Sequence, residues 1–116
     1  MERIKPRYFK GGNENMRICV NEIDGLQTRS FIIDIKIFDK KIETLDDVKN
    51  AVMKACTEYI NTEIGKKTYE YNCKCFNWAD FESEVPNEIC RKYGFEKEST
   101  PVADEFVDWD EQLIIE

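Results

Sequence analysis

Cysteine and carboxylate side chains are the residues of this sequence whose types and spacing could support chemistry. The five cysteines form an odd set without a Cys-x-x-Cys pair: Cys19, Cys56, Cys73, Cys75 and Cys90. Alternation along a strand would place Cys73 and Cys75 on one face, where other thiols could complete a tetrahedral zinc site. The usual spacing of paired zinc ligands is absent, however, and cysteine is often buried. We therefore expect reduced core thiols, with a cysteine-based zinc-binding or redox module as the alternative.

Histidine is absent from the sequence. Ser-His-Asp and Cys-His nucleophile systems, His-based zinc proteases and His-based general acid-base catalysis are therefore unavailable to this chain alone. Neither of the glycine-rich phosphate-binding motifs is present. The 24 acids guarantee that some carboxylates lie close together, but a chain of 116 residues has little material for a glycosidase cleft. We expect a protein that is not an enzyme and that carries no cofactor.

The most distinctive segment is 99–116, which contains six acids and neither Lys nor Arg. Apolar residues are interspersed among these acids, so the segment could offer a partner both apolar anchors and negative charge. The residues predicted to contact a partner are Asp104, Glu105, Phe106, Asp108, Trp109, Asp110 and Glu111. Secondary contacts are predicted for a second acidic stretch, at Asp80, Glu82 and Glu84. The segment lacks the glycine and the spaced oxygens of a calcium loop, so no metal site is expected.

Composition indicates one folded domain with an uneven distribution of charge. An apolar fraction of 41% and an aromatic fraction of 12% are typical of a globular chain rather than a disordered one. We expect residues 1–98 to form a single domain with a basic N-terminal arm at 1–15, followed by an acidic and aromatic segment at 99–116. The net charge of −7 disfavours nucleic acid and favours a basic target protein, such as a nuclease or another nucleic-acid-binding protein.

No targeting or membrane-spanning segment is recognisable in the sequence. The first ten residues contain charges and no apolar run, which argues against a signal peptide, and no stretch approaches the length of a membrane span. We expect a cytoplasmic protein without a membrane partner.

Apolar periodicity predicts an α+β fold that begins with a β-hairpin. Strands at 16–23 and 26–38 would be joined by a two-residue turn at Asp24-Gly25. This turn would set Ile18 opposite Phe31 and Met16 opposite Ile33. Alternation in the second strand places Phe31, Ile33, Ile35 and Ile37 on one face, which we expect to be the core face.

The remaining elements are expected to complete a ββαβα order. A capping box of Thr44 and Asp47 starts an apolar helical stripe that is predicted to end near Gly65, and this main helix should lie across the apolar face of the hairpin. A third strand of the antiparallel sheet is predicted from Lys67 to about Trp78. A short second helix follows at 86–93, and the acidic C-terminal tail is expected to end in a short strand at 111–115.

In size, charge and lack of a catalytic set, the chain is similar to the small acidic inhibitors made by phages and other mobile elements, such as anti-CRISPR proteins. Toxin-neutralising immunity proteins have a similar build. This likeness is one of general character, and no motif carries it. It implies a non-catalytic protein that binds and inhibits a basic target, with carboxylates in the positions of DNA phosphates. A structural subunit that uses its tail for strand addition is a further alternative.

Overall fold

Two long antiparallel strands form the centre of the sheet. Strand β1 spans Glu14–Asp24 and strand β2 spans Gln27–Ile37. The computed structural model describes residues 14–24, 27–99, 105–109, 113 and 115. Four helices follow the hairpin: α1 (Leu45–Ile60), α2 (Glu63–Tyr71), α3 (Trp78–Glu84) and α4 (Asn87–Arg91). The chain then returns to the sheet with β3 (Phe95–Glu98) and β4 (Glu105–Trp109).

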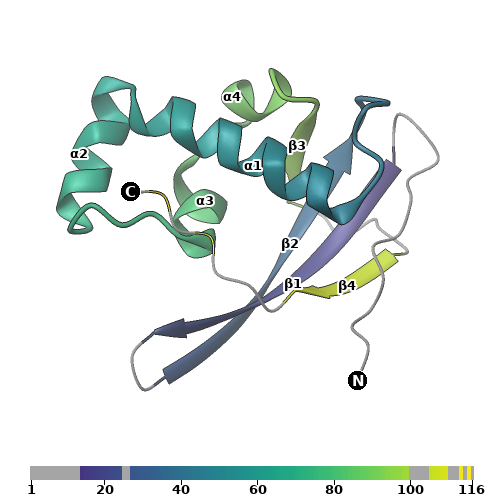
Figure 1. Cartoon of the computed structure of the whole chain (residues 1–116), viewed down its shortest axis with the longest axis horizontal. Coiled ribbons are helices and arrows are strands. Elements are labelled where there is room, and N and C mark those ends of the chain that lie inside the picture. The colour runs from purple at the N-terminus through teal and green to yellow at the C-terminus, as the bar shows by residue number, and fades with distance from the viewer. Residues whose placement is uncertain (1–13, 25–26, 100–104, 110–112, 114, 116) are drawn as a thin grey trace.

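The sheet has the strand order β3-β2-β1-β4, and helix α1 crosses it (Figure 1). Strand β3 is antiparallel to β2, whereas β4 is parallel to β1. One face of the two central strands is buried, through Met16, Ile18, Val20, Ile33, Ile35 and Ile37. The predicted α+β class, an antiparallel sheet packed against one main helix, is confirmed. Within the described residues, no helix combines the length and the apolar character needed to cross a membrane.

The hairpin forms as predicted, but its register differs by two residues. The observed pairs include Ile18 with Ile33, Met16 with Ile35 and Asp24 with Gln27. The predicted turn at Asp24-Gly25 is therefore wrong, because the two residues between the paired ends are 25 and 26, which lie outside the described residues. Since side chains alternate with a period of two, a shift of two residues keeps the same side chains on the core face.

Helix α1 begins as predicted and ends earlier than predicted. The Asp47 N–H donates to Thr44 Oγ1 at 3.2 Å and the Thr44 N–H donates to Asp47 Oδ2 at 3.1 Å, which confirms the capping box. The helix ends at Ile60, and Thr62 then caps α2 by accepting the Gly65 N–H at 3.0 Å. Gly65 therefore lies inside α2 and does not terminate α1.

Gly65 is required at this position because α2 starts against the end of α1. A Cβ atom on Gly65 would lie 1.7 Å from the backbone oxygen of Tyr59. Only glycine allows this approach, since a backbone oxygen cannot turn aside as a flexible side chain can.

The third strand predicted from Lys67 to Trp78 is wrong. Its first part belongs to helix α2, and the chain then passes through two left-handed residues, Cys73 at φ 59° and Lys74 at φ 61°. The Lys74 N–H donates to Tyr69 O at 2.8 Å, which closes the end of α2. Asn77 then starts α3 with a second capping box. The third antiparallel strand of the sheet is instead β3, so the observed order is ββααααββ.

The short helix predicted at 86–93 is confirmed as α4, which has Pro86 at its N-cap. Gly94 follows the helix with a φ of +94°, and its carbonyl accepts the Phe38 N–H at 3.0 Å. This bond joins the end of the helical layer to the end of β2.

The C-terminal segment contributes to the fold at two places. The strand predicted at 111–115 is not observed, because the described residues Leu113 and Ile115 are not in a strand, and β4 precedes them. Leu113 is buried in the core, and the Ile115 N–H donates to Phe76 O at 3.2 Å. The segment 99–116 therefore supplies both a strand and a core side chain to the domain that precedes it.

We predict that Gly65→Ala lowers the free energy of unfolding by about 1–3 kcal/mol, because the added methyl group would overlap the Tyr59 carbonyl and force α1 and α2 apart. Chemical denaturation followed by circular dichroism measures this change. Lys66→Ala, at the exposed neighbouring position, should alter stability by no more than about 0.5 kcal/mol. A Gly65→Ala protein as stable as the wild type would contradict the close approach.

Candidate partner-binding surfaces

Four of the seven predicted contact residues lie in β4, an edge strand of the sheet: Glu105, Phe106, Asp108 and Trp109. The backbone of β4 is aligned with β1, with Phe106 opposite Arg17 and Asp108 opposite Cys19. The remaining three predicted residues, Asp104, Asp110 and Glu111, lie outside the described residues. The backbone of the predicted contact region is therefore fixed along β4 by its pairing with β1.

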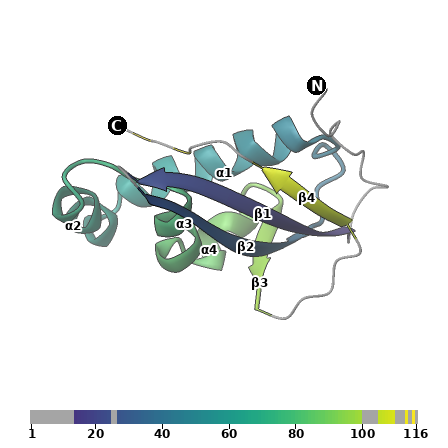
Figure 2. The same cartoon turned by 90° about the horizontal axis from the view of Figure 1, so that it is seen from below.

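The secondary acidic stretch is on helix α3, where its three members differ in environment. Asp80 is half-buried, and its carboxylate accepts the Asn77 N–H at 3.0 Å and the Asn72 side-chain amide at 3.1 Å. Glu82 and Glu84 are exposed. Asp80 thus acts in capping α3, whereas Glu82 and Glu84 are accessible. Helix α3 and strand β4 lie apart in both views (Figures 1 and 2).

Lys97 fixes α3 against the sheet. Its ammonium group donates to Phe81 O at 2.7 Å and to Glu82 O at 2.8 Å, and it lies 5.1 Å from the centre of the Phe81 ring. Burial lowers the pKa of this lysine from its ordinary value. The two carbonyl groups that accept these bonds lie toward the C-terminal end of α3, where the helix dipole favours a cation.

The five cysteines are not arranged as a cysteine-based zinc site would require. Cys73 is exposed at the end of α2, and it does not share a strand face with the half-buried Cys75. Cys56 and Cys90 are fully buried. Within the described part of the chain, no three side chains of the metal-binding types come together to hold an ion. Burial raises the pKa of Cys90 to about 11 and raises that of Cys56 further, so both thiols are protonated at neutral pH and are poor nucleophiles.

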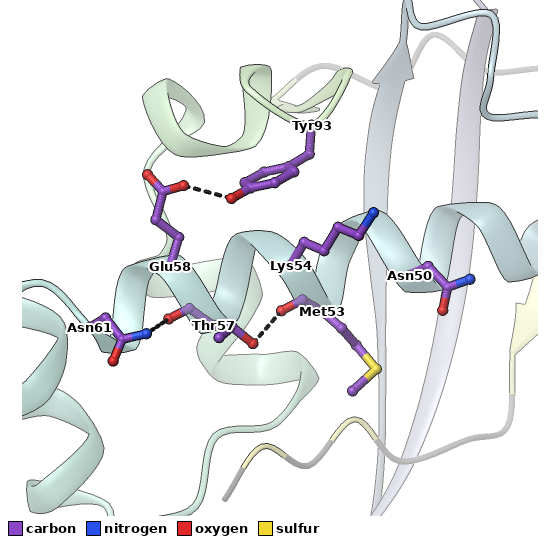
Figure 3. Close-up of a pocket in the computed structure, with 7 residues that line it drawn as sticks. All are labelled: Asn50, Met53, Lys54, Thr57, Glu58, Asn61 and Tyr93. Atoms are coloured by element: carbon purple, nitrogen blue, oxygen red, sulfur yellow. Dashed lines mark hydrogen bonds between the residues drawn. The ribbon is translucent and has the colours of Figure 1, made fainter.

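A groove along the outer side of α1 was not predicted from the sequence. It has a volume of about 750 Å³ and is lined by Asn50, Met53, Lys54, Thr57, Glu58, Asn61 and Tyr93 (Figure 3). The Glu58 carboxylate accepts the Tyr93 hydroxyl at 2.7 Å and the Lys92 ammonium at 2.6 Å, and these bonds lower its pKa. The bond to Glu58 also raises the pKa of Tyr93. The groove therefore offers amide, hydroxyl and ammonium groups for hydrogen bonding.

One signal in the sequence could have located this groove. Its α1 residues recur at helical spacing on the side opposite the apolar stripe, where Met53 stands among polar residues. The contribution of Tyr93 could not be inferred, since it depends on how the turn after α4 packs against α1.

No protein-family model, curated protein or solved structure matches this chain.

We predict that stability decreases from about pH 9 to pH 11. The pKa of Cys90 rises from its ordinary value of 9.0 to about 11 on folding, so the folded state retains a proton that the unfolded state releases in this range. Stability is therefore complete below pH 9 and falls with rising pH, by at most about 1.4 kcal/mol per pH unit for one thiol. Denaturant titrations at several pH values measure this slope.

Cys90→Ala removes this thiol, whereas Cys56 and the half-buried Lys97 are present in both proteins. The variant should lose less stability than the wild type over the same interval. Identical slopes for the two proteins would show that the Cys90 thiol does not control the alkaline transition.

Proposed function

We propose that this chain is a non-catalytic acidic protein that binds and inhibits a basic target protein, one that handles nucleic acid. The observation that carries the proposal is the position of Glu105–Trp109 in the edge strand β4. An edge strand is accessible along its outer side, and its charged residues decide which chains can approach it. A basic surface is attracted to such an edge, whereas an acidic one is repelled.

Anchoring in the sheet supports binding because it reduces the entropy lost on association. A free tail must be ordered by its partner, and that cost is subtracted from the binding free energy. In β4 the pairing with β1 fixes the backbone before any partner arrives. The net charge of −7 then steers a basic protein toward the molecule and accelerates the encounter.

The class of target follows from the charge of the contact region. Carboxylates at spaced positions can occupy the phosphate-binding sites of a nuclease or a related protein and so exclude its substrate. On this proposal the chain acts as a DNA mimic, in the manner of the anti-CRISPR proteins and other small acidic inhibitors of phages and mobile elements. Glu82 and Glu84 on α3 are proposed as secondary contacts, and Asp80 is not, because its carboxylate is engaged within the fold.

The test is charge reversal in the contact region. The target is first captured by chemical cross-linking in a lysate of the source organism and then purified for binding and activity measurements. Changing Asp108, Asp110 and Glu111 together to Lys should weaken binding by about 100-fold at low salt, because attractive charge pairs become repulsive. The wild-type protein should abolish the activity of the target at a one-to-one ratio.

A matched control reverses three exposed acids elsewhere, at Glu43, Asp46 and Glu70. This variant has the same net charge as the first, so it should bind nearly as well as the wild type. If both variants bind the target equally weakly, the effect is one of net charge alone, and the assignment of the contact region is contradicted. Truncation at Ser99 is not an adequate substitute, because it also removes Leu113 from the core.

A further inference from the structure

A second, smaller hollow adjoins the groove on α1. It has a volume of about 290 Å³, and it shares Asn50, Lys54 and Tyr93 with the groove, so the two hollows are continuous. Lys41 and Lys92 line only the smaller hollow. We refer to this hollow, which has Lys41, Lys54 and Lys92 in its wall, as the lysine hollow. The groove itself has a volume typical of pockets that hold small molecules.

The two carboxylates beside the lysine hollow are already bonded within the fold. Asp39 accepts the Lys41 N–H at 2.9 Å. Asp47 Oδ2 accepts the N–H groups of Glu43 and Thr44, each at 3.1 Å, as part of the cap of α1. Backbone donors therefore offset part of the negative charge of both carboxylates, and neither carboxylate forms an ion pair with a lysine of the hollow among the described residues.

The three lysines of this hollow differ in their partners. The Lys92 ammonium donates to the Glu58 carboxylate at 2.6 Å, so its charge is neutralised by a direct ion pair. Lys41 and Lys54 are exposed, and within the described part of the chain neither forms an ion pair. Two ammonium groups at the lysine hollow are therefore available to an anion, which they would bind through charge-assisted hydrogen bonds.

The groove, in contrast, offers hydrogen-bond acceptors. The Thr57 hydroxyl donates to Met53 O at 2.8 Å, and the Asn61 side-chain amide donates to Thr57 O at 3.0 Å (Figure 3). The Tyr93 hydroxyl donates to Glu58 at 2.7 Å. Because these bonds use their donor hydrogens, the hydroxyl oxygens and the Asn61 amide oxygen can accept bonds from hydroxyl groups of a ligand. The Met53 side chain and the Tyr93 ring add apolar contact area.

We propose that the groove and the lysine hollow together bind a small phosphate monoester of a hydroxylated molecule, a sugar or a nucleoside. The phosphate lies at the lysine hollow, between Lys41 and Lys54, and the hydroxylated part lies along the groove beside Thr57 and Asn61. A phosphate monoester matches two ammonium groups better than a carboxylate does, because it carries nearly two negative charges at neutral pH.

The net charge of −7 is compatible with such a ligand. At physiological ionic strength the field of a charge is screened over about 8 Å, so acids elsewhere on the surface contribute little at the lysine hollow. A long polyanion would extend over the acidic surface, whereas a small phosphate monoester does not. The inference is independent of the proposed inhibitory function, because it uses none of the contact residues assigned on β4 and α3.

The first test is a nuclear magnetic resonance titration of the full ¹⁵N-labelled chain at about 0.15 M salt. The probes are uridine 5′-monophosphate and ribose 5-phosphate, each compared with its phosphate-free counterpart and with inorganic phosphate. Both monoesters should cause amide shifts at 41–61 and 92–93 that saturate at millimolar concentration. Equal affinity for the two monoesters would assign a sugar phosphate, and tighter binding of the uridine monoester would assign a nucleotide.

The second test removes one ammonium group at a time. Lys41→Gln and Lys54→Gln, both at exposed positions, should each weaken binding about fivefold, as expected for one exposed charge pair. Lys66→Gln, at an exposed position on α2, makes the same change in net charge and should bind as the wild type does.

Four results would each overturn the proposed site. They are the absence of saturable shifts up to about 20 mM monoester, equal binding of uridine and its monophosphate, equal binding of inorganic phosphate and the monoesters, and equal weakening by Lys66→Gln and the two hollow variants.

Discussion

The pairing of β1 with β2 is the interaction on which the rest of the structure depends. It extends over eleven residue pairs, and each strand then pairs on its outer side with one further strand. Its alternation also creates the buried face against which the helices pack. An isolated hairpin is only marginally stable in water, so the hairpin and the helical layer stabilise each other. A register shift of one residue in this pair would turn the core side chains to the opposite face.

Polar side chains at the junctions then determine how the short helices are placed. Thr62 links the end of α1 to the start of α2, since its hydroxyl donates to Tyr59 O at 2.7 Å and accepts the Gly65 N–H at 3.0 Å. Asp80 joins the start of α3 to the residues that precede it, and Lys97 joins the end of α3 to the sheet. Helices α2 to α4 have only five to nine residues, and isolated helices of this length are marginal in water. These hydrogen bonds therefore add stability that the intrinsic helix propensity of such short segments does not provide.

Sequence reasoning succeeded where the signal was local and failed where it depended on neighbours. The hairpin, the start of α1 and helix α4 follow from alternation, a capping box and the Pro86 to Gly94 pattern. The failed strand at 67–78 has alternating tyrosines and cysteines, but Thr62 caps a helix that runs to Tyr71, and the chain then turns at Cys73 and Lys74. For the candidate site, the sequence identified the acidic residues but not the pairing of β4 with β1. That pairing joins distant parts of the chain, and local periodicity carries no information about it.

The parallel pairing of β4 with β1 has a consequence for the order in which the molecule can be assembled. Strand β1 is separated from β4 by β2, the four helices and β3, so this long stretch of chain must form a loop before the two strands meet. Contacts of such long sequence separation are slow to form compared with the local contacts of the hairpin and of α1. The hairpin and the helices are therefore expected to form first. The edge strand that bears acidic residues is then expected to join a partly formed domain.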